Sequence, residues 1–303
     1  MNSIFDHCLL FIDFMKGIIL AGGTGSRLFP TTISTSKQLI PIYDKPLIYY
    51  PLSVLMLAGI REILIISSPK DIPRFIDLLG DGAHFGINIT YTEQIKPNGI
   101  AEAFILGKEF IGNDSVALIL GDNFFFGYGF SEILKNSIKD LNTGATIFGY
   151  YVKDPERFGI VEFDANHKPI SIEEKPERPK SNYAIVGLYF YDNNVVKISE
   201  NIKPSPRGEL EISDVNKKYL SNEELSLRIL GRGFTWLDTG NPDSLLDASH
   251  FVKTIQERQG LQIACLEEIA FKNKWIGNKV LEQAISRMSG TAYGEYLITL
   301  IND

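Results

Sequence analysis

The segment Gly17–Arg27, "GIILAGGTGSR", decides the fold class, because a short apolar run leads directly into a glycine-rich turn. A run of this length is typical of a buried strand. The glycines at 22–25 allow the backbone to approach a phosphate closely and to turn its N–H groups toward it. Arg27, and Lys37 ten residues later, supply positive charge that can bind phosphate oxygens. A tight turn beside a surface arginine is the alternative interpretation.

Outward from this segment, apolar runs alternate with helical patterns, which predicts a mostly parallel sheet with helices on both faces. Strands are expected at Gly17–Ala21, Glu62–Ser67, Ile87–Tyr91, Val116–Leu120 and Ala145–Val152. Helices are expected at Pro46–Ala58, Ile72–Leu79, Ala101–Ile111 and Phe130–Lys139. Pro46 suits a first helical turn, where its missing N–H group is not needed.

The pattern changes after Asp154, where apolar runs joined by short polar turns indicate a mixed or antiparallel insertion. Strands are expected there at Ile160–Phe163, Ile170–Glu174 and Tyr183–Tyr191, followed by a helix over 209–220 and strands over 226–231 and 234–238. From Pro242 onward the chain is expected to be helical. We divide it into a loose extension (1–14), a core that includes this insertion (15–245) and a helical section packed on the core (246–303).

Composition excludes several classes of protein. The formal net charge of −7 argues against a nucleic-acid binder, which would carry a basic face. Two cysteines and four scattered histidines give neither zinc-ligand spacing nor a disulfide framework. Residues 1–14 lack a basic start and are too short to span a bilayer, so we expect no membrane association.

Two common nucleotide motifs fail in the glycine turn. Gly23-Thr24-Gly25-Ser26-Arg27-Leu28 begins like the dinucleotide fingerprint, but Leu28 replaces the third glycine that close helix packing requires. Asp44 has the spacing of the ribose-binding acid in that motif but lies in a turn. The Walker pattern fails as well, because no Gly-Lys-Ser/Thr follows at the required spacing.

Two aspartates end apolar runs, Asp122 in "VALILGDN" and Asp238 in "FTWLD". Acids at the carboxyl ends of strands face the crevice in which open α/β sheets bind ligands. Magnesium prefers few carboxylates together with substrate phosphates, so this pair is a plausible Mg²⁺ site. In "ISIEEKP", a period of two places Glu174 on the face of Ile170 and Ile172. Sugar hydroxyls would partner that carboxylate, and fraying of the strand end is the alternative.

The stretch "LAGGTGSRLFP" at 20–30, together with Lys37 and "PIYDKPLIYYPL" at 41–52, resembles the signature of the sugar nucleotidyltransferases, and among them the glucose-1-phosphate thymidylyltransferases. The resemblance runs from Met15 to the C-terminus. It implies a Rossmann-like three-layer αβα fold, and transfer of a thymidylyl group from dTTP to glucose 1-phosphate with Mg²⁺. It also implies a cytoplasmic homotetramer (a dimer of dimers) in the first step of deoxysugar synthesis of the dTDP-rhamnose type.

The same resemblance implies roles for individual residues. The nucleotide would be bound by Gly22, Gly23, Thr24, Gly25, Ser26, Arg27, Lys37, Gln38, Gln94 and Gly99. The sugar would be bound by Asn123, Gly159, Glu174, Lys175 and Val186, and Mg²⁺ by Asp122 and Asp238. Catalysis would rest on Arg27, Lys37, Asp122 and Lys175.

Some alternatives stay open at this point. UTP could replace dTTP, another hexose 1-phosphate could replace the glucose ester, and a non-catalytic sensing homologue is possible. In this sequence, Tyr128, Gly129 and Arg232 resemble parts of a second, inhibitory site that the family has between its subunits. However, Leu266 and Lys272 stand where the family usually has proline and arginine, and lysine does not preserve a bidentate arginine contact.

Overall fold

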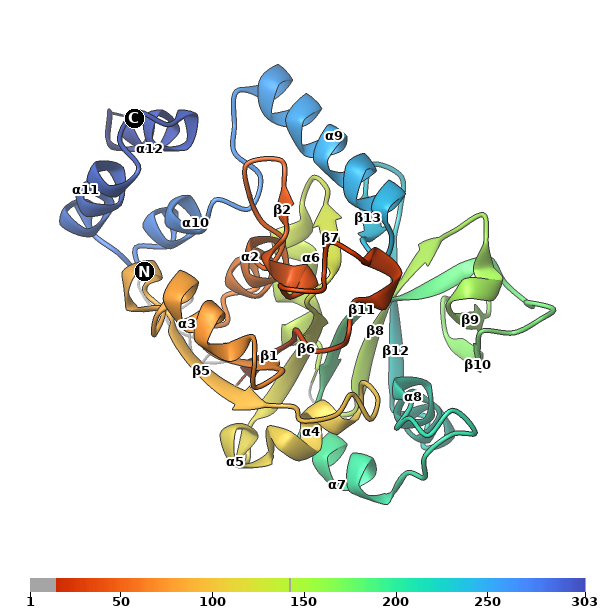
Figure 1. Cartoon of the computed structure of the whole chain (residues 1–303). Helices are drawn as coiled ribbons and strands as arrows, with labels where there is room; N and C mark the ends of the chain where they lie inside the picture. The colour runs from red at the N-terminus through yellow and green to blue at the C-terminus, as the bar shows by residue number, and fades with distance from the viewer. Residues whose placement is uncertain (1–14, 142, 303) are drawn as a thin grey trace, which may run out of the picture.

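The computed structural model describes residues 15–141 and 143–302, so the expectation for residues 1–14 lies outside it. Within these residues a nine-stranded mixed sheet forms the centre of the molecule (Figure 1). Its main path runs in the order β10-β9-β11-β6-β1-β4-β5, while β8 pairs with β11 and β12 pairs with β8. The strands are β1 Met15–Leu20, β4 Glu62–Ser67, β5 Asn88–Glu93, β6 Ser115–Leu120, β8 Ala145–Tyr151, β9 Gly159–Phe163, β10 Pro169–Glu174, β11 Tyr183–Tyr191 and β12 Leu225–Leu230.

The pairing directions agree with the two halves of the sequence pattern. Strands β5, β4, β1 and β6 are parallel, whereas β11 runs antiparallel to β6, β8 and β9. Parallel strands are covered on both faces and therefore read as continuous apolar runs. In β1, Ile18 and Ile19 are both fully buried but belong to different core clusters on opposite faces. The predicted α/β class with a mixed, mostly parallel sheet is confirmed.

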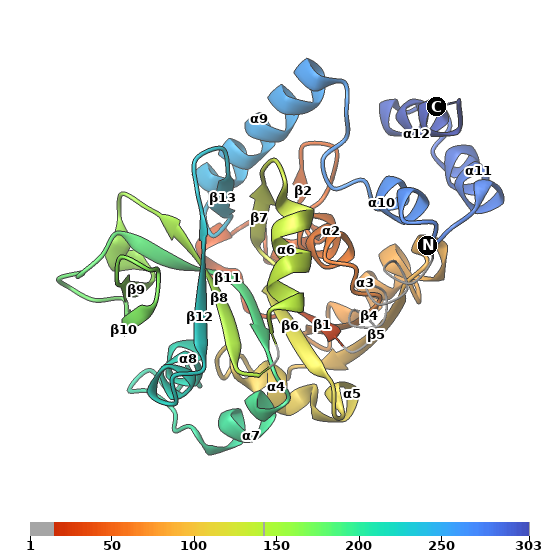
Figure 2. The ribbon, with the colours of Figure 1, turned by 180° about the vertical axis from the view of Figure 1, so that it is seen from behind.

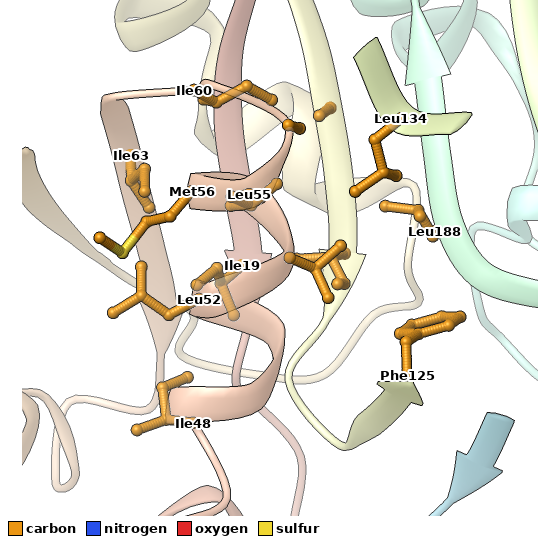
Figure 3. Packing of buried hydrophobic residues seen from close by; sticks show 14 of the residues in the cluster. Ile19, Ile48, Leu52, Leu55, Met56, Ile60, Ile63, Phe125, Leu134 and Leu188 are labelled. Carbon is orange, nitrogen blue, oxygen red and sulfur yellow. The ribbon is translucent and has the colours of Figure 1, made fainter. Parts of the chain in front are cut away.

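Helices cover both faces of the sheet, which gives three layers (Figures 1 and 2). On one face lie α2 Tyr49–Leu57, α3 Ile72–Leu79, α6 Phe130–Lys139 and α10 Leu266–Lys272. On the other lie α4 Glu102–Leu106, α5 Lys108–Ile111, α7 Asn194–Asn201 and α8 Ile212–Ser221. Figure 3 shows how Leu52 and Leu55 of α2 pack with Ile19 and Ile63 of the strands on the first face.

The start of α2 differs from the prediction. Pro46 is not in a first helical turn but in strand β3 (Lys45–Pro46), which pairs with β2 (Pro41–Ile42). Tyr43, at a φ of 62°, makes the turn of this hairpin, and the N–H group of Leu47 donates to the carbonyl of Ile40 at 3.0 Å. These bonds hold Pro46 extended, so α2 begins only at Tyr49.

Further differences arise where tertiary contacts interrupt a local pattern. The predicted helix 101–111 is divided at Gly107, which packs against Ile18 and Leu64 of the sheet. Helix α7 was not predicted. Strand β13 (Thr235–Asp238) does not join the main sheet but pairs with β7 (Asn123–Phe126), a strand that the sequence did not indicate.

The predicted apolar face of β10 is wrong at one position. The register of β10 against β9 shifts between Pro169 and Ser171, so Ile170 lies in a bulge. Its side chain is 55% exposed, while Ile172 is buried. Because a bulge changes the face of the bulged residue, Ile170 does not share the face of Ile172 and Glu174.

The chain is helical from Pro242 onward, as predicted. Helix α9 (Pro242–Gln259) begins with a capping box in which Asn241 Oδ1 accepts from the N–H group of Ser244 at 2.9 Å. It is followed by α10, α11 (Asn278–Arg287) and α12 (Ala292–Asn302), and the expected boundary at 245/246 falls inside α9. Among the residues described here, none forms a helix that is both long and apolar enough to cross a membrane.

Candidate active site

The glycine turn lies at the carboxyl end of β1, between the ends of two neighbouring strands. The N–H group of Ala21 donates to Ile66 at the end of β4 (2.8 Å), and that of Gly121, after β6, donates to Leu20 (2.9 Å). Gly23 and Gly25 have φ values of 100° and 59°, in the left-handed region that favours glycine. The turn is therefore built at the sheet edge where α/β folds bind ligands.

A first pocket, with a volume of about 360 Å³, opens over this turn. All ten residues expected to bind the nucleotide line it: Gly22, Gly23, Thr24, Gly25, Ser26, Arg27, Lys37, Gln38, Gln94 and Gly99. Ser36 Oγ donates to Gln38 Oε1 at 2.6 Å and fixes that amide. The structure thus brings segments from three separate parts of the chain to one cavity.

Gln94 is held in one orientation by a residue that the sequence analysis missed. Its side chain is buried, and its Nε2 donates to Glu102 Oε2 at 2.8 Å. Glu102 also accepts from Asn98 Nδ2 at 2.7 Å. An ionised carboxylate only accepts hydrogen bonds, so the Gln94 amide must point its nitrogen to Glu102. Its Oε1 lies against Gly22, where a Cβ atom would collide with it.

A second pocket, of about 390 Å³, adjoins the first, because Arg27 and Asp122 line both. Of the residues expected at the sugar or the metal, it contains Asn123, Gly159, Glu174, Lys175 and Asp238 besides Asp122. Val186 lines neither pocket, and its side chain is buried in the core. Its neighbours Ile185 and Gly187 line the second pocket instead.

Asn123 is held at the junction by two donors. The indole Nε1 of Trp236 donates to its Oδ1 at 2.6 Å, and the N–H group of Gly187 donates to the same oxygen at 3.1 Å. A side chain at Gly187 would collide with this amide. The Nδ2 group of Asn123 donates to Asp122 Oδ1 at 2.9 Å. Asn123 therefore connects strands β7, β11 and β13 to the first of the two acids.

Asp122 and Asp238 lie beside each other and have opposite pKa shifts. The N–H group and the hydroxyl of Thr239 both donate to the Asp122 carbonyl, at 3.1 and 2.7 Å, which ties the end of β13 to the end of β6. Burial would raise the pKa of Asp122, but the charge and hydrogen bond of Lys37 outweigh it and lower that pKa. Burial and the charge of Asp122 raise the pKa of Asp238.

Glu174 is surrounded by partners that the sequence did not reveal. The Ser213 hydroxyl donates to its Oε2, and Arg207 Nη2 lies 3.5 Å from its Oε1. Lys175 Nζ is 3.9 Å from the same oxygen. Ser213 and Arg207 belong to α8 and to the loop before it, and nothing in their local sequence indicates that they meet β10.

Comparison with known proteins agrees with this arrangement. A family model for nucleotidyl transferases matches residues 16–255, and the chain belongs to that family of enzymes. A glucose-1-phosphate thymidylyltransferase of Neisseria meningitidis is 58% identical over 287 residues, covering 95% of this chain and 99% of that protein. One of Mycobacterium tuberculosis is 52% identical over 287 residues, with the same coverage of 95% and 99%. Within the family, the chain therefore groups with the glucose-1-phosphate thymidylyltransferases.

Solved structures show the same architecture. A Bacillus anthracis protein assigned to the same activity, crystallised with sucrose, is 42% identical and has a TM-score of 0.72 over 78% of this chain and 94% of that one. A UDP-glucose pyrophosphorylase complexed with UDP-glucose is 22% identical, with a TM-score of 0.71 over 80% of this chain and 99% of its own. The second likeness concerns the fold alone.

Proposed function

We propose that this protein transfers a thymidylyl group from dTTP to α-D-glucose 1-phosphate and releases pyrophosphate and dTDP-glucose. The observation that carries the proposal is the junction of the two pockets at Arg27 and Asp122. One pocket has a glycine turn and cations suited to a triphosphate, and the other has carboxylate and amide groups suited to a sugar. The thymidylyltransferases that are more than half identical to this chain support the choice of substrates.

The reaction is an in-line displacement at the α-phosphorus of dTTP. A phosphate monoester has a second pKa of about 6, so glucose 1-phosphate is largely a dianion at neutral pH. It is already a nucleophile, and no general base is needed. Catalysis then consists of aligning the two esters and neutralising their charge.

The cations of the cleft divide this task. Arg27, at the junction, would stabilise the pyrophosphate as it leaves, because a guanidinium can bind two phosphate oxygens at once. Lys37 would balance charge around the triphosphate, and Lys175 would hold the phosphate of the sugar. The backbone N–H groups of the glycine turn add partial positive charge without the bulk of side chains.

The donor set of the cleft fits Mg²⁺. Within residues 15–141 and 143–302 no cluster of three or more histidine, cysteine, aspartate or glutamate residues could enclose a metal ion. Asp122, at the pocket junction, and Asp238, in the second pocket, provide two hard carboxylates, and Mg²⁺ completes its shell with water and substrate phosphates. Bound there, the ion would neutralise charge on the phosphates, and its own charge would relieve the repulsion that raises the pKa of Asp238.

From the resemblance we also propose a cytoplasmic homotetramer, formed as a dimer of dimers, that acts in the first step of dTDP-rhamnose-type deoxysugar synthesis. The fully exposed side chain of Tyr128 supports the presence of an interface. Light scattering on a gel-filtration column measures the mass, and a monomer at micromolar concentration would contradict the assembly.

One assay tests the function itself. Pyrophosphate release is measured for each common nucleoside triphosphate with several hexose 1-phosphates, with and without Mg²⁺. We expect dTTP with glucose 1-phosphate and Mg²⁺ to give the highest kcat/KM, and UTP to follow within a factor of about 10–200, because one methyl group separates the bases. Binding of dTDP-glucose without release of pyrophosphate from any pair would instead indicate a sensing homologue.

A further inference from the structure

One side chain of the second pocket has a hydrogen-bonding group that nothing in the protein satisfies. Among the described residues, only two buried side-chain polar atoms have no partner, Ser199 Oγ and Asn216 Nδ2. Asn216, on α8, is completely buried and lines the second pocket, whereas Ser199 lines neither pocket of the cleft. A buried donor without an acceptor costs stability and is rare in native proteins. The Asn216 amide is therefore expected to serve a ligand.

The orientation of the Asn216 amide is fixed by a buried tyrosine. The hydroxyl of Tyr191 donates to Asn216 Oδ1 at 2.5 Å. Tyr191 is fully buried in β11, and burial raises its pKa well above the ordinary value, so the phenol keeps its proton. Because Oδ1 is occupied, the amide presents Nδ2, a donor, to the pocket.

The Glu174 carboxylate, an acceptor, lines the same pocket as this donor. Ser213, one helical turn before Asn216 on α8, donates through its hydroxyl to Glu174 Oε2. Residues three apart on a helix have their Cβ atoms about 5–6 Å from each other. Asn216 and the Glu174 carboxylate are thus neighbours in one wall of the pocket, with opposite hydrogen-bonding character. A hydroxyl group is the ligand that satisfies both, because it donates one hydrogen bond and accepts another.

We propose that Asn216 donates to the oxygen of one ring hydroxyl of the sugar, while Glu174 accepts the proton of that hydroxyl. The inference rests on the proposed function, because it assumes that the second pocket binds a hexose 1-phosphate. It adds a specificity-determining residue that selects a hydroxyl at one carbon of the sugar. A hydrogen atom at that carbon would leave the amide without an acceptor and would remove one hydrogen bond from the Glu174 carboxylate, which keeps its contacts to Ser213, Arg207 and Lys175.

The test combines deletions in the substrate with deletions in the protein. Glucose 1-phosphate and its 2-, 3-, 4- and 6-deoxy analogues are assayed with dTTP by pyrophosphate release. The variant is Asn216→Leu combined with Tyr191→Phe. Replacing both partners of the hydrogen bond by apolar groups of similar shape leaves no new unpaired polar group in the core. Ser199→Ala removes the other unpaired atom and is the matched control. Thermal unfolding shows whether each variant is folded.

We expect the wild type and the control to reject one deoxy analogue by about 10–100-fold in kcat/KM, which is the cost of leaving one buried donor unsatisfied. The double variant should lose a similar factor with glucose 1-phosphate, and its discrimination against that analogue should fall by at least about fivefold, because only the Glu174 contact to the hydroxyl is left. Its ratios for the other three analogues and its KM for dTTP should not change. A folded variant that keeps the wild-type ratio for every analogue, or loses all four ratios alike, would overturn the assignment. A wild type inactive with glucose 1-phosphate would instead refute the proposed function, and the inference with it.

Discussion

The two acids of the cleft should respond to the same substitution with stability changes of opposite sign. Asp238 has a raised pKa, so its ionised form makes the folded state less stable than it would be with a neutral group. The pKa of Asp122 is lowered by Lys37, so its ionised form stabilises the fold. Asp238→Asn should therefore raise the free energy of unfolding, and Asp122→Asn should lower it.

The stability gain expected for Asp238→Asn follows from the charged groups around Asp238. Two like charges roughly 6 Å apart repel by about 3 kcal/mol at an effective dielectric constant of about 20. Attraction of Asp238 by Lys37 and Arg27 offsets part of this. We expect a net gain of about 1–2 kcal/mol for Asp238→Asn, which in a chain of this size raises Tm by several degrees, at about 2–4 °C per kcal/mol. Asp122→Asn leaves the Lys37 ammonium without its carboxylate partner and should lower the free energy of unfolding by about 1–3 kcal/mol.

Urea unfolding in a buffer with EDTA measures both values at pH 7.5, and pyrophosphate release with Mg²⁺ measures activity in parallel. Asp247→Asn, on the exposed side of α9, is the control and should stay within about 0.5 kcal/mol of the wild type. Both cleft variants should lose at least about 100-fold in kcat, since the proposed metal ligand set is incomplete. If Asp238→Asn were less stable than the wild type, or as active, the assigned repulsion and role would be refuted.

Three further substitutions probe separate parts of the molecule. Arg27→Ala should lower kcat far more than it raises KM for glucose 1-phosphate, because charge on the leaving group grows only in the transition state; steady-state kinetics with an unchanged kcat would exclude that role. Burial raises the pKa of Glu267, so wild-type stability relative to Glu267→Gln should increase as the pH falls from 8 toward 5; urea titrations that run parallel across this range would contradict the shift. Gly99→Ala should destabilise the fold by more than about 2 kcal/mol and weaken dTTP binding, because its Cβ would collide with the Leu210 backbone; Gly208→Ala has a similar positive φ in open space and should cost clearly less, and equal costs in thermal unfolding would rule out the collision.

Much of the fold could be predicted because its signals are local. Strands β4 and β11 and helices α3 and α6 have the expected bounds, since each is a periodic run that ends at a turn. The glycine turn was recognisable because its backbone requirement is visible in the residue types. The start of α2 was not predictable in this way, because the hairpin that captures Pro46 depends on a hydrogen bond between Leu47 and Ile40.

The polar partners in the cleft are the part that the sequence conceals. Glu102 and Ser213 look like ordinary residues at the starts of helices, where acids and hydroxyls are common. Their importance comes from what the fold places opposite them, Gln94 and Glu174. Asn216 gives no signal at all within α8, since only the burial of its amide against Tyr191 makes the unpaired nitrogen significant.

The negative net charge of the chain is compatible with a cleft that binds two anions, because the two properties act over different distances. At physiological ionic strength charges are screened beyond about 8 Å, so carboxylates elsewhere on the surface hardly affect a bound phosphate. Arg27, Lys37 and Lys175 come from three separate segments, and only the folded chain brings them to the two adjoining pockets of the cleft. Substrate binding should accordingly depend on these contacts rather than on long-range attraction, which the overall charge of −7 would oppose.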